Sequence, residues 1–121
     1  MIKLNTDGSY TTSNGISRLG GILRDYKVNL IMAFSQPTTC SSNIIAEAVA
    51  VKFGVQWCIL NGYKNFSLEL DSIAVAQMIM DKQANIYKMV NLIYEISQIL
   101  SQGSVNVSHC FREANSLVKL A

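Results

Sequence analysis

Residues 2–9, IKLNTDGS, decide the fold that we expect for this chain. The apolar and polar side chains of this stretch alternate, which is the two-residue period of a β-strand that buries one face. We predict a strand over residues 2–6 that ends at Asp7, and then a turn-rich connection that extends to Asn14-Gly15. The strand would therefore carry a carboxylate at its C-terminal tip.

A second stretch of the same kind, FSLELD at residues 66–71, also ends in an acid. We predict a strand over residues 65–70 with Asp71 at its tip. Each acid also has a simpler interpretation. Asp7 followed by Gly8 is typical of a turn, and Asp71 followed by Ser72 is typical of a helix N-cap. Taken one at a time, the two stretches leave these alternatives open.

Glu47 lies among small and apolar residues in a helix that we predict over residues 43–60, ending at Asn61-Gly62. Its neighbours on the helix surface would be Asn43, Ala50, Val51 and Gly54. A capping box does not explain Glu47, because Ile44 stands three residues after the expected cap. A carboxylate in such surroundings needs a polar partner or a cation.

The order of the predicted elements indicates an α/β fold. We expect strands over residues 2–6, 19–25, 29–35, 65–70 and 105–110, and helices over 43–60, 72–80 and 85–100, with a last helix from Glu113. In the helix over 85–100 one apolar stripe is formed by Ile86, Met89, Val90, Ile93, Ile96 and Leu100. Three successive strands, followed by strands that alternate with helices, predict a five-stranded mixed sheet flanked by helices, with the first three strands antiparallel.

The bulk composition predicts a single domain over residues 1–121. The formal net charge is +2 and no run of basic residues occurs, so we expect any nucleic-acid binding to be weak or focused on one site. We expect no signal peptide, no window with the length and hydrophobicity of a membrane span, and a monomer. Cys40, Cys58 and Cys110 are odd in number and widely spaced, which indicates reduced thiols. The expected lack of a signal peptide and of a membrane span predicts a cytoplasmic or nuclear location.

Five separated motifs together resemble type 1 ribonuclease H. They are Asn5-Thr6-Asp7-Gly8-Ser9, Leu19-Gly20-Gly21-Ile22-Leu23-Arg24-Asp25, Ala46-Glu47, Glu69-Leu70-Asp71-Ser72, and His109 with Arg112-Glu113-Ala114-Asn115. They follow the family's order and spacing over residues 2–121. Within the family, the chain looks most similar to plant copies derived from non-LTR retrotransposons. The resemblance implies a ribonuclease H-like fold and leaves open a former fusion to a reverse transcriptase.

The resemblance also implies a reaction, which is hydrolysis of the RNA strand of an RNA/DNA hybrid by two-metal phosphodiester cleavage. Asp7, Glu47 and Asp71 would be catalytic residues and metal ligands, and such oxygen ligands suit Mg²⁺, with Mn²⁺ as an alternative. His109 matches the family's mobile histidine, which assists proton transfer or product release.

The substrate contacts implied by the family motifs involve Gly8, Ser9, Asn43 and Asn115. Discrimination of RNA from DNA requires recognition of the 2′-hydroxyl, and Asn43 is positioned in the motif to make such a contact in the minor groove. The alternative for Asn43 is a structural role as an N-cap beside Ser42.

Three positions depart from the family pattern. Lys119 stands where the family has its fourth metal-binding acid, and Arg18 and Val28 stand where the plant copies usually have glycine. A β-branched residue forced to a positive φ is costly, so Val28 predicts a strained turn. A catalytically inactive nucleic-acid-binding domain of the same fold is therefore the alternative to an active nuclease. A protein-interaction surface is a third alternative. The chain also ends about two turns into the last expected helix, which suggests a truncated C-terminus.

Overall fold

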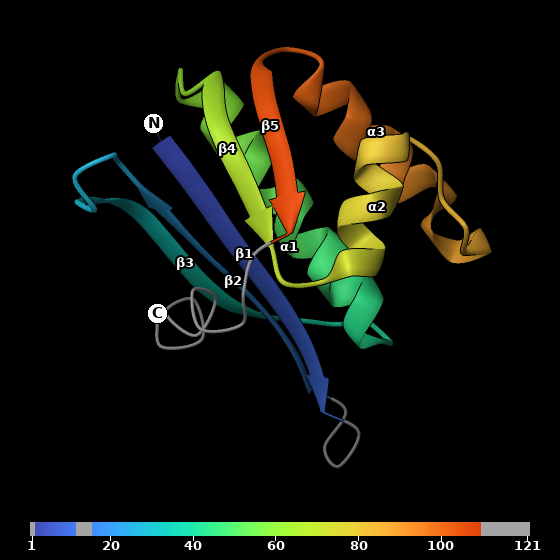
Figure 1. Ribbon diagram of the computed structural model, residues 1–121. Helices are drawn as coiled ribbons and strands as arrows, with labels where there is room; N and C mark the ends of the chain where they lie inside the picture. The colour runs from blue at the N-terminus through green and yellow to red at the C-terminus, as the bar shows by residue number, and fades with distance from the viewer. Residues whose placement is uncertain (1, 12–15, 110–121) are drawn as a thin grey trace.

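The computed structural model describes residues 2–11 and 16–109 of the chain as one sheet with helices packed against it (Figure 1). In chain order the elements are β1 (Ile2–Thr11), β2 (Ile16–Arg24), β3 (Leu30–Thr38), α1 (Asn43–Leu60), β4 (Asn65–Leu70), α2 (Ile73–Asp81), a 3₁₀ turn η1 (Tyr87–Met89), α3 (Val90–Leu100) and β5 (Ser104–His109). The expected last helix and Cys110 lie outside the described residues.

The five strands form one mixed sheet in the order β3-β2-β1-β4-β5. β1, β2 and β3 are joined as an antiparallel meander, whereas β1 pairs with β4, and β4 with β5, in parallel. The parallel pairs need crossover connections, and α1 supplies the first of them while α2 and α3 supply the second. The predicted five-stranded mixed sheet with three antiparallel strands first is confirmed.

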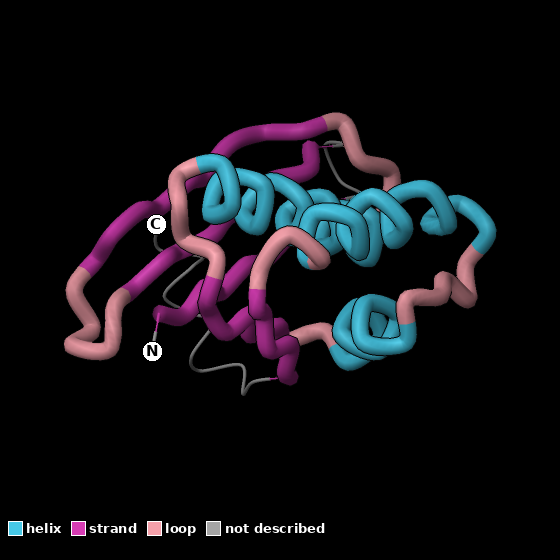
Figure 2. The backbone as a smooth tube through the Cα atoms, turned by 90° about the horizontal axis from the view of Figure 1, so that it is seen from above, coloured by secondary structure: helices cyan, strands magenta, loops and turns pink. Residues whose placement is uncertain are grey.

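The core lies between the sheet and α1. The registers place Leu23, Leu4, Leu68 and Val107 in one row across four strands. The leucines of this row are fully buried, as are Val51 and Val55 of α1. In Figure 2 the described helices lie together on one side of the strands, which is where this apolar row faces them. Burial of this area is the main contribution to stability.

Several predicted boundaries were wrong, since β2 begins three residues earlier and β3 ends three residues later than expected, and two further differences affect the site and the core. β1 does not end at Asp7 but continues to Thr11. Its pairing with β4 ends at Thr6, but residues 7–11 still pair with residues 16–20 of β2 and stay extended. The predicted helix over 85–100 begins only at Val90, after the short η1 turn. Val90 is 51% exposed, so it is not part of the buried stripe, which consists of Met89, Ile93 and Ile96.

The expectation that no segment has the length and hydrophobicity of a membrane span was also wrong. Helix α1 has 18 residues and a mean hydropathy of 1.4, which meets both criteria. In the fold, however, 44% of the residues in this window are buried, and α1 packs on β1, β2 and α3. A central helix of a folded domain meets the same criteria, so length and composition alone do not distinguish the two cases.

The cysteines of the described residues are free thiols. Cys58 is fully buried in α1, and burial raises the pKa of its thiol to about 12. Cys40 is half-buried, after the end of β3. The raised pKa keeps Cys58 protonated and therefore unreactive at neutral pH.

The turn between β2 and β3 contains the strained residue that the sequence predicted. Val28 has a φ of 66° and is 69% exposed. Asp25 holds the turn, since its carboxylate accepts hydrogen bonds from the main-chain N–H groups of Lys27 (2.8 Å) and Asn29 (2.9 Å). The bond from Asn29 is the main reason that the pKa of Asp25 lies below its usual range. The turn thus forces Val28 into a conformation that suits glycine.

We predict that Val28→Gly increases the free energy of unfolding by about 1 kcal/mol, because it removes the steric cost of a β-branched residue in the left-handed region. Urea denaturation of both proteins measures this difference. Lys82→Gly is the matched control: Lys82 also has a positive φ, 55°, but it is not β-branched, so the gain should be smaller. A lower free energy of unfolding in Val28→Gly would contradict the conclusion that Val28 is strained.

Candidate metal centre

Three carboxylates from distant parts of the sequence meet at one point of the sheet. One ligand oxygen from each of Asp7, Glu47 and Asp71 lies within 4.8 Å of the other two. Asp7 is only 9% exposed, and the other two acids are half-buried. The structure therefore brings together the three acids that the sequence predicted as one site.

The sheet registers explain why Asp7 and Asp71 meet. Thr6 of β1 pairs with Leu70, which is the last residue of β4. Asp7 and Asp71 follow this pair on neighbouring strands, and Figure 1 shows the tip of β4 beside the middle of β1. The adjacent parallel strands thus deliver two carboxylates to the same edge, although β1 itself continues past that edge.

Gly8 brings Glu47 to the same point. A Cβ atom added at Gly8 would lie closer than 3.0 Å to main-chain atoms of Ala46 and Glu47, a separation that real side chains essentially never show. Only glycine lets the first turns of α1 rest on β1 at this distance. Asp7-Gly8 is therefore not a turn, because Gly8 lies inside β1 and permits close packing.

The observed helix caps decide whether Asp71 is an N-cap and whether Glu47 belongs to a capping box. The N-cap of α2 is Ser72, whose hydroxyl accepts a hydrogen bond from the N–H of Val75 at 3.2 Å, so Asp71 is not needed as a cap. The N-cap of α1 is Ser42, which accepts from Ile45 at 3.3 Å. Glu47 lies two residues beyond Ile45 and belongs to no capping box.

Asn43 is the first residue of α1 and not its cap. It is exposed, and its side-chain oxygen accepts a hydrogen bond from the main-chain N–H of Tyr10 in β1. This bond ties the start of α1 to β1 three residues beyond Asp7. Ser9 is exposed in the same part of β1, whereas Gly8 is buried under the helix. Asn115, the remaining predicted contact, lies outside the described residues, as does Lys119.

His109 reaches the site from β5. It is the last residue of that strand, is exposed, and pairs in register with Leu70. Its Nε2 atom lies 3.1 Å from the main-chain oxygen of Asp71, so a protonated Nε2 donates a hydrogen bond to that oxygen. The imidazole is thereby held beside a candidate metal ligand.

Sequence reasoning missed a polar network next to the site. Asn5, which is fully buried, donates a hydrogen bond to Glu69 at 3.3 Å and accepts one from Arg24 at 2.8 Å. Glu69 also forms an ion pair with Lys3 at 3.3 Å. Glu69 therefore has a structural partner on each side and is not part of the metal centre. The sequence pattern did not reveal this network, because Asn5 alternates with Leu4 and Thr6 and falls on the same side as the polar Lys3 and Asp7.

The donor set fits a hard divalent cation. All three groups are carboxylates, which are the preferred ligands of Mg²⁺, and like charges at this separation repel unless a cation or a proton neutralises them. Oxygens bound to one Mg²⁺ lie no farther apart than about 4.2 Å, twice the metal–oxygen distance. The span of 4.8 Å is therefore slightly open for a single ion, and a small side-chain adjustment would close it.

The sequence model of the reverse transcriptase-like family matches residues 5–121 of this chain. The chain belongs to this family. A comparison with curated protein sequences gives no match.

Solved structures that are similar to this chain identify its fold. RNase H1 of the archaeon Halobacterium salinarum has a TM-score of 0.90 at 16% identity, covering 98% of this chain and 92% of the other. LC11-RNase H1, isolated from compost and solved with an RNA/DNA hybrid, has a TM-score of 0.86 at 19% identity, covering 99% and 92%.

A foamy viral protease-reverse transcriptase in complex with an RNA/DNA hybrid has a TM-score of 0.81 at 19% identity. The match covers 99% of this chain but only 19% of that one, so this chain is similar to one part of a larger protein. Together these structures confirm the predicted ribonuclease H-like fold, while the origin from a plant retrotransposon stays a prediction.

We predict opposite effects on stability for the two neighbours at the start of α2. Asp71→Asn should leave the free energy of unfolding equal or higher without metal, because it removes one of three repelling charges. Ser72→Ala should lose about 1 kcal/mol, because it removes the N-cap. Denaturation with and without Mg²⁺ measures both, and Mg²⁺ should stabilise the parent protein more than Asp71→Asn. A larger loss in Asp71→Asn than in Ser72→Ala would refute this assignment.

Proposed function

We propose that this protein is a divalent-metal-dependent ribonuclease that hydrolyses the RNA strand of RNA/DNA hybrids. The observation that carries the proposal is the convergence of Asp7, Glu47 and Asp71 within 4.8 Å in a ribonuclease H-like fold. Two structures with this fold, LC11-RNase H1 and the foamy viral enzyme, were solved with such hybrids, which supports this class of substrate.

Asp7, Glu47 and Asp71 would hold the metal, Mg²⁺ or Mn²⁺, which when bound lowers the pKa of the attacking water and stabilises the leaving oxygen. The chain itself supplies rigidity. Asp7 is fixed inside a paired strand, Glu47 is fixed by the packing of α1 at Gly8, and Asp71 stands between a strand end and a capped helix. Ligands held on such rigid elements need little rearrangement when charge develops in the reaction.

The substrate would lie across the exposed residues beside this cluster. Ser9 and Asn43 are both exposed there, and an amide N–H₂ is a donor suited to the 2′-hydroxyl of RNA. The hydrogen bond from Tyr10 uses the oxygen of Asn43 and thereby orients its N–H₂ group outward from β1. This geometry supports a role in recognising RNA for Asn43, and a supporting role for Ser9.

His109 would act as the auxiliary residue of the site. Its contact with the main-chain oxygen of Asp71 keeps the imidazole next to the carboxylates, where it can move a proton to or from a departing product. The contact is on an exposed side chain at the end of β5, so rotation of the ring away from Asp71 meets little steric resistance.

Cleavage of a labelled RNA/DNA hybrid under single-turnover conditions tests the proposal. We expect Mg²⁺- or Mn²⁺-dependent cleavage of the RNA strand, abolished in Asp71→Asn, with no cleavage of duplex DNA. Ser72→Ala is the control, since it perturbs the same turn without removing a metal ligand. Hybrid binding without cleavage at any metal concentration would instead support a catalytically inactive nucleic-acid-binding domain.

Lys119 separates the active and inactive alternatives further. The family resemblance implies that Lys119 stands at the fourth acid position, so Lys119→Asp should add a ligand and raise the rate at least about tenfold, equivalent to about 1.4 kcal/mol. The wild-type rate should be low. Equal rates in the two proteins would show that Lys119 does not lie at the metal site.

A further inference from the structure

The two edges of the sheet differ in how they are protected. β3 forms one edge and contains Pro37, which cannot donate a main-chain hydrogen bond. In the described part of the chain β5 forms the other edge, and its sequence, SVNVSH, contains neither proline nor a permanently charged residue. Edge strands without such features are templates for pairing with another segment.

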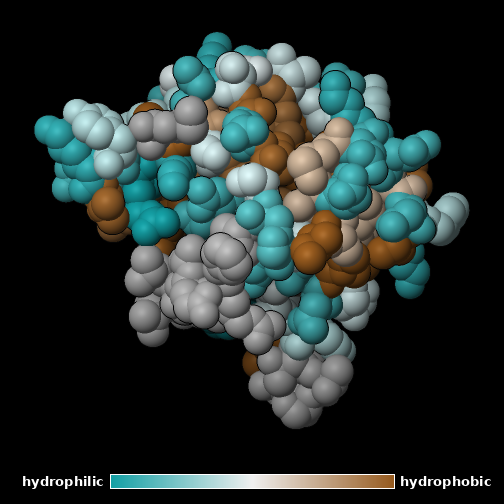
Figure 3. Space-filling model, in the orientation of Figure 1, coloured by the Kyte–Doolittle hydropathy of each residue, from teal (hydrophilic) through white to brown (hydrophobic). Residues whose placement is uncertain are grey.

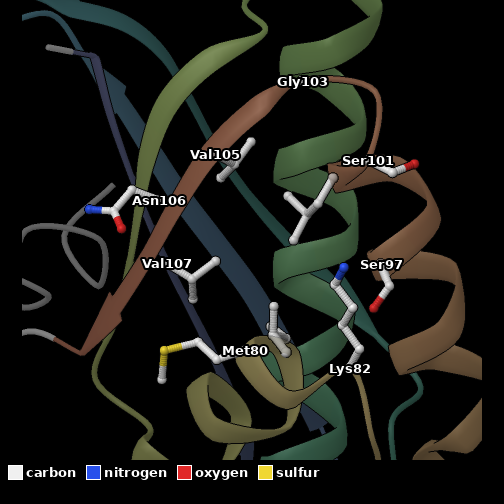
Figure 4. Close-up of a pocket in the computed structure, with 10 residues that line it drawn as sticks. Met80, Lys82, Ser97, Ser101, Gly103, Val105, Asn106 and Val107 are labelled. Carbon is white, nitrogen blue, oxygen red and sulfur yellow. The ribbon is translucent and has the colours of Figure 1, made fainter.

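A cavity of about 470 Å³ runs along this edge, between β5 and the C-terminal ends of α2 and α3 (Figure 4). Three consecutive residues of β5 line it, Val105, Asn106 and Val107. The side chains of Val105 and Val107 point from β5 toward the helices, whereas that of Asn106 points to the other side of the strand (Figure 4), so the cavity lies along the edge on the helix-covered face of the sheet. Its volume is that of a site for a short peptide or small molecule.

Apolar side chains form much of the cavity wall. Ile79, Met80 and Leu100 complete the apolar lining, and Figure 3 shows apolar surface over the same part of the molecule, around β5. The hydroxyl of Ser97 is buried without a hydrogen-bond partner. This oxygen is shielded from solvent, so it does not contact the open space of the cavity and is no ligand contact.

Lys82 supplies the positive charge of the cavity. It ends α2 in a left-handed conformation, and its side chain lines the cavity together with Ser97 (Figure 4). The ion pairs within the described residues lie elsewhere, between Lys3 and Glu69 and between Lys52 and Glu95. The ammonium of Lys82 is thus available to a carboxylate from another molecule.

We propose that the edge of β5 binds an extended segment of a partner protein. The segment would add to the sheet through main-chain hydrogen bonds to β5, place an apolar side chain in the cavity beside Val105 and Val107, and bring a carboxylate to the exposed Lys82. In this proposal the edge of β5 would supply the main-chain hydrogen bonds, the apolar walls would favour an apolar side chain, and the ammonium of Lys82 would favour an acidic residue. This site is separate from the carboxylate cluster.

The test is a titration of the ¹⁵N-labelled full chain with the capped peptide acetyl-Thr-Val-Thr-Val-Glu-amide, followed by amide chemical shifts. We expect saturable shifts at residues 104–109 and at Lys82. Replacing the glutamate of the peptide by lysine, or making Lys82→Glu, should weaken binding about tenfold, and combining the two changes should restore it. Lys27→Glu, the same change at an exposed lysine of the distant turn, should leave the affinity unchanged.

Other outcomes would overturn the proposal. No shift at millimolar peptide, or equal binding of a peptide N-methylated at its valines, would exclude pairing with the strand edge. If acetate caused the same chemical-shift changes as the peptide, the site would be a pocket for small anions and not a peptide-binding edge. Concentration-dependent shifts at β5 without peptide would show that a second copy of this chain covers the edge. Asp71→Asn should bind the peptide normally, so that failure of the nuclease proposal and failure of this one are distinguishable.

Discussion

The close approach of α1 to β1 is the constraint on which the rest of the structure depends. Gly8 and Gly54 make this approach feasible at two points, since a Cβ at Gly8 would meet the main chain of α1 and a Cβ at Gly54 would lie 3.0 Å from Leu4. Between these points α1 contributes the fully buried Ala48 and Val51. At Gly8 the helix lies against the main chain of β1, and Glu47 is thereby placed next to the carboxylate of Asp7.

The same contact joins stability to chemistry. The apolar row that includes Leu4 and Leu68 lies under α1, so burial of the core and placement of Glu47 depend on one interface. The clustered acids oppose folding through their mutual repulsion, and the surrounding elements offset this cost with the Ser72 cap and with the partners that hold Glu69. A bound divalent ion would remove this repulsion, which supports the proposed metal site.

Much of this arrangement could be predicted from the sequence. The bounds of α1 and β4 were predicted to the residue, because Asn61-Gly62 and Asn65 give sharp local signals. The extent of β1 was not, because Asp7-Gly8 has the composition of a turn and only the pairing with β2 keeps it extended. The pairing of residues 7–11 with β2 cannot be inferred from local sequence propensity.

The convergence of the acids was expected from family motifs, whereas its geometric cause was not visible in the sequence. Gly8 and the buried Asn5 gave no indication of what they contact until the tertiary structure placed them. The exposure of Val90 was missed for a related reason, since the η1 turn shifts the start of α3 and rotates that residue out of the apolar stripe. Such features depend on packing between segments far apart in the chain.

Direct measurement of Mn²⁺ binding tests the central claim, that the contact at Gly8 assembles one divalent-metal site. In an electron paramagnetic resonance titration, the wild-type protein should bind Mn²⁺ saturably, and Mg²⁺ should displace it. Glu47→Gln should weaken binding at least about tenfold without unfolding the protein, because it removes the ligand that α1 contributes. Equal Mn²⁺ affinity in wild type and Glu47→Gln, or no saturable binding in wild type, would contradict the account.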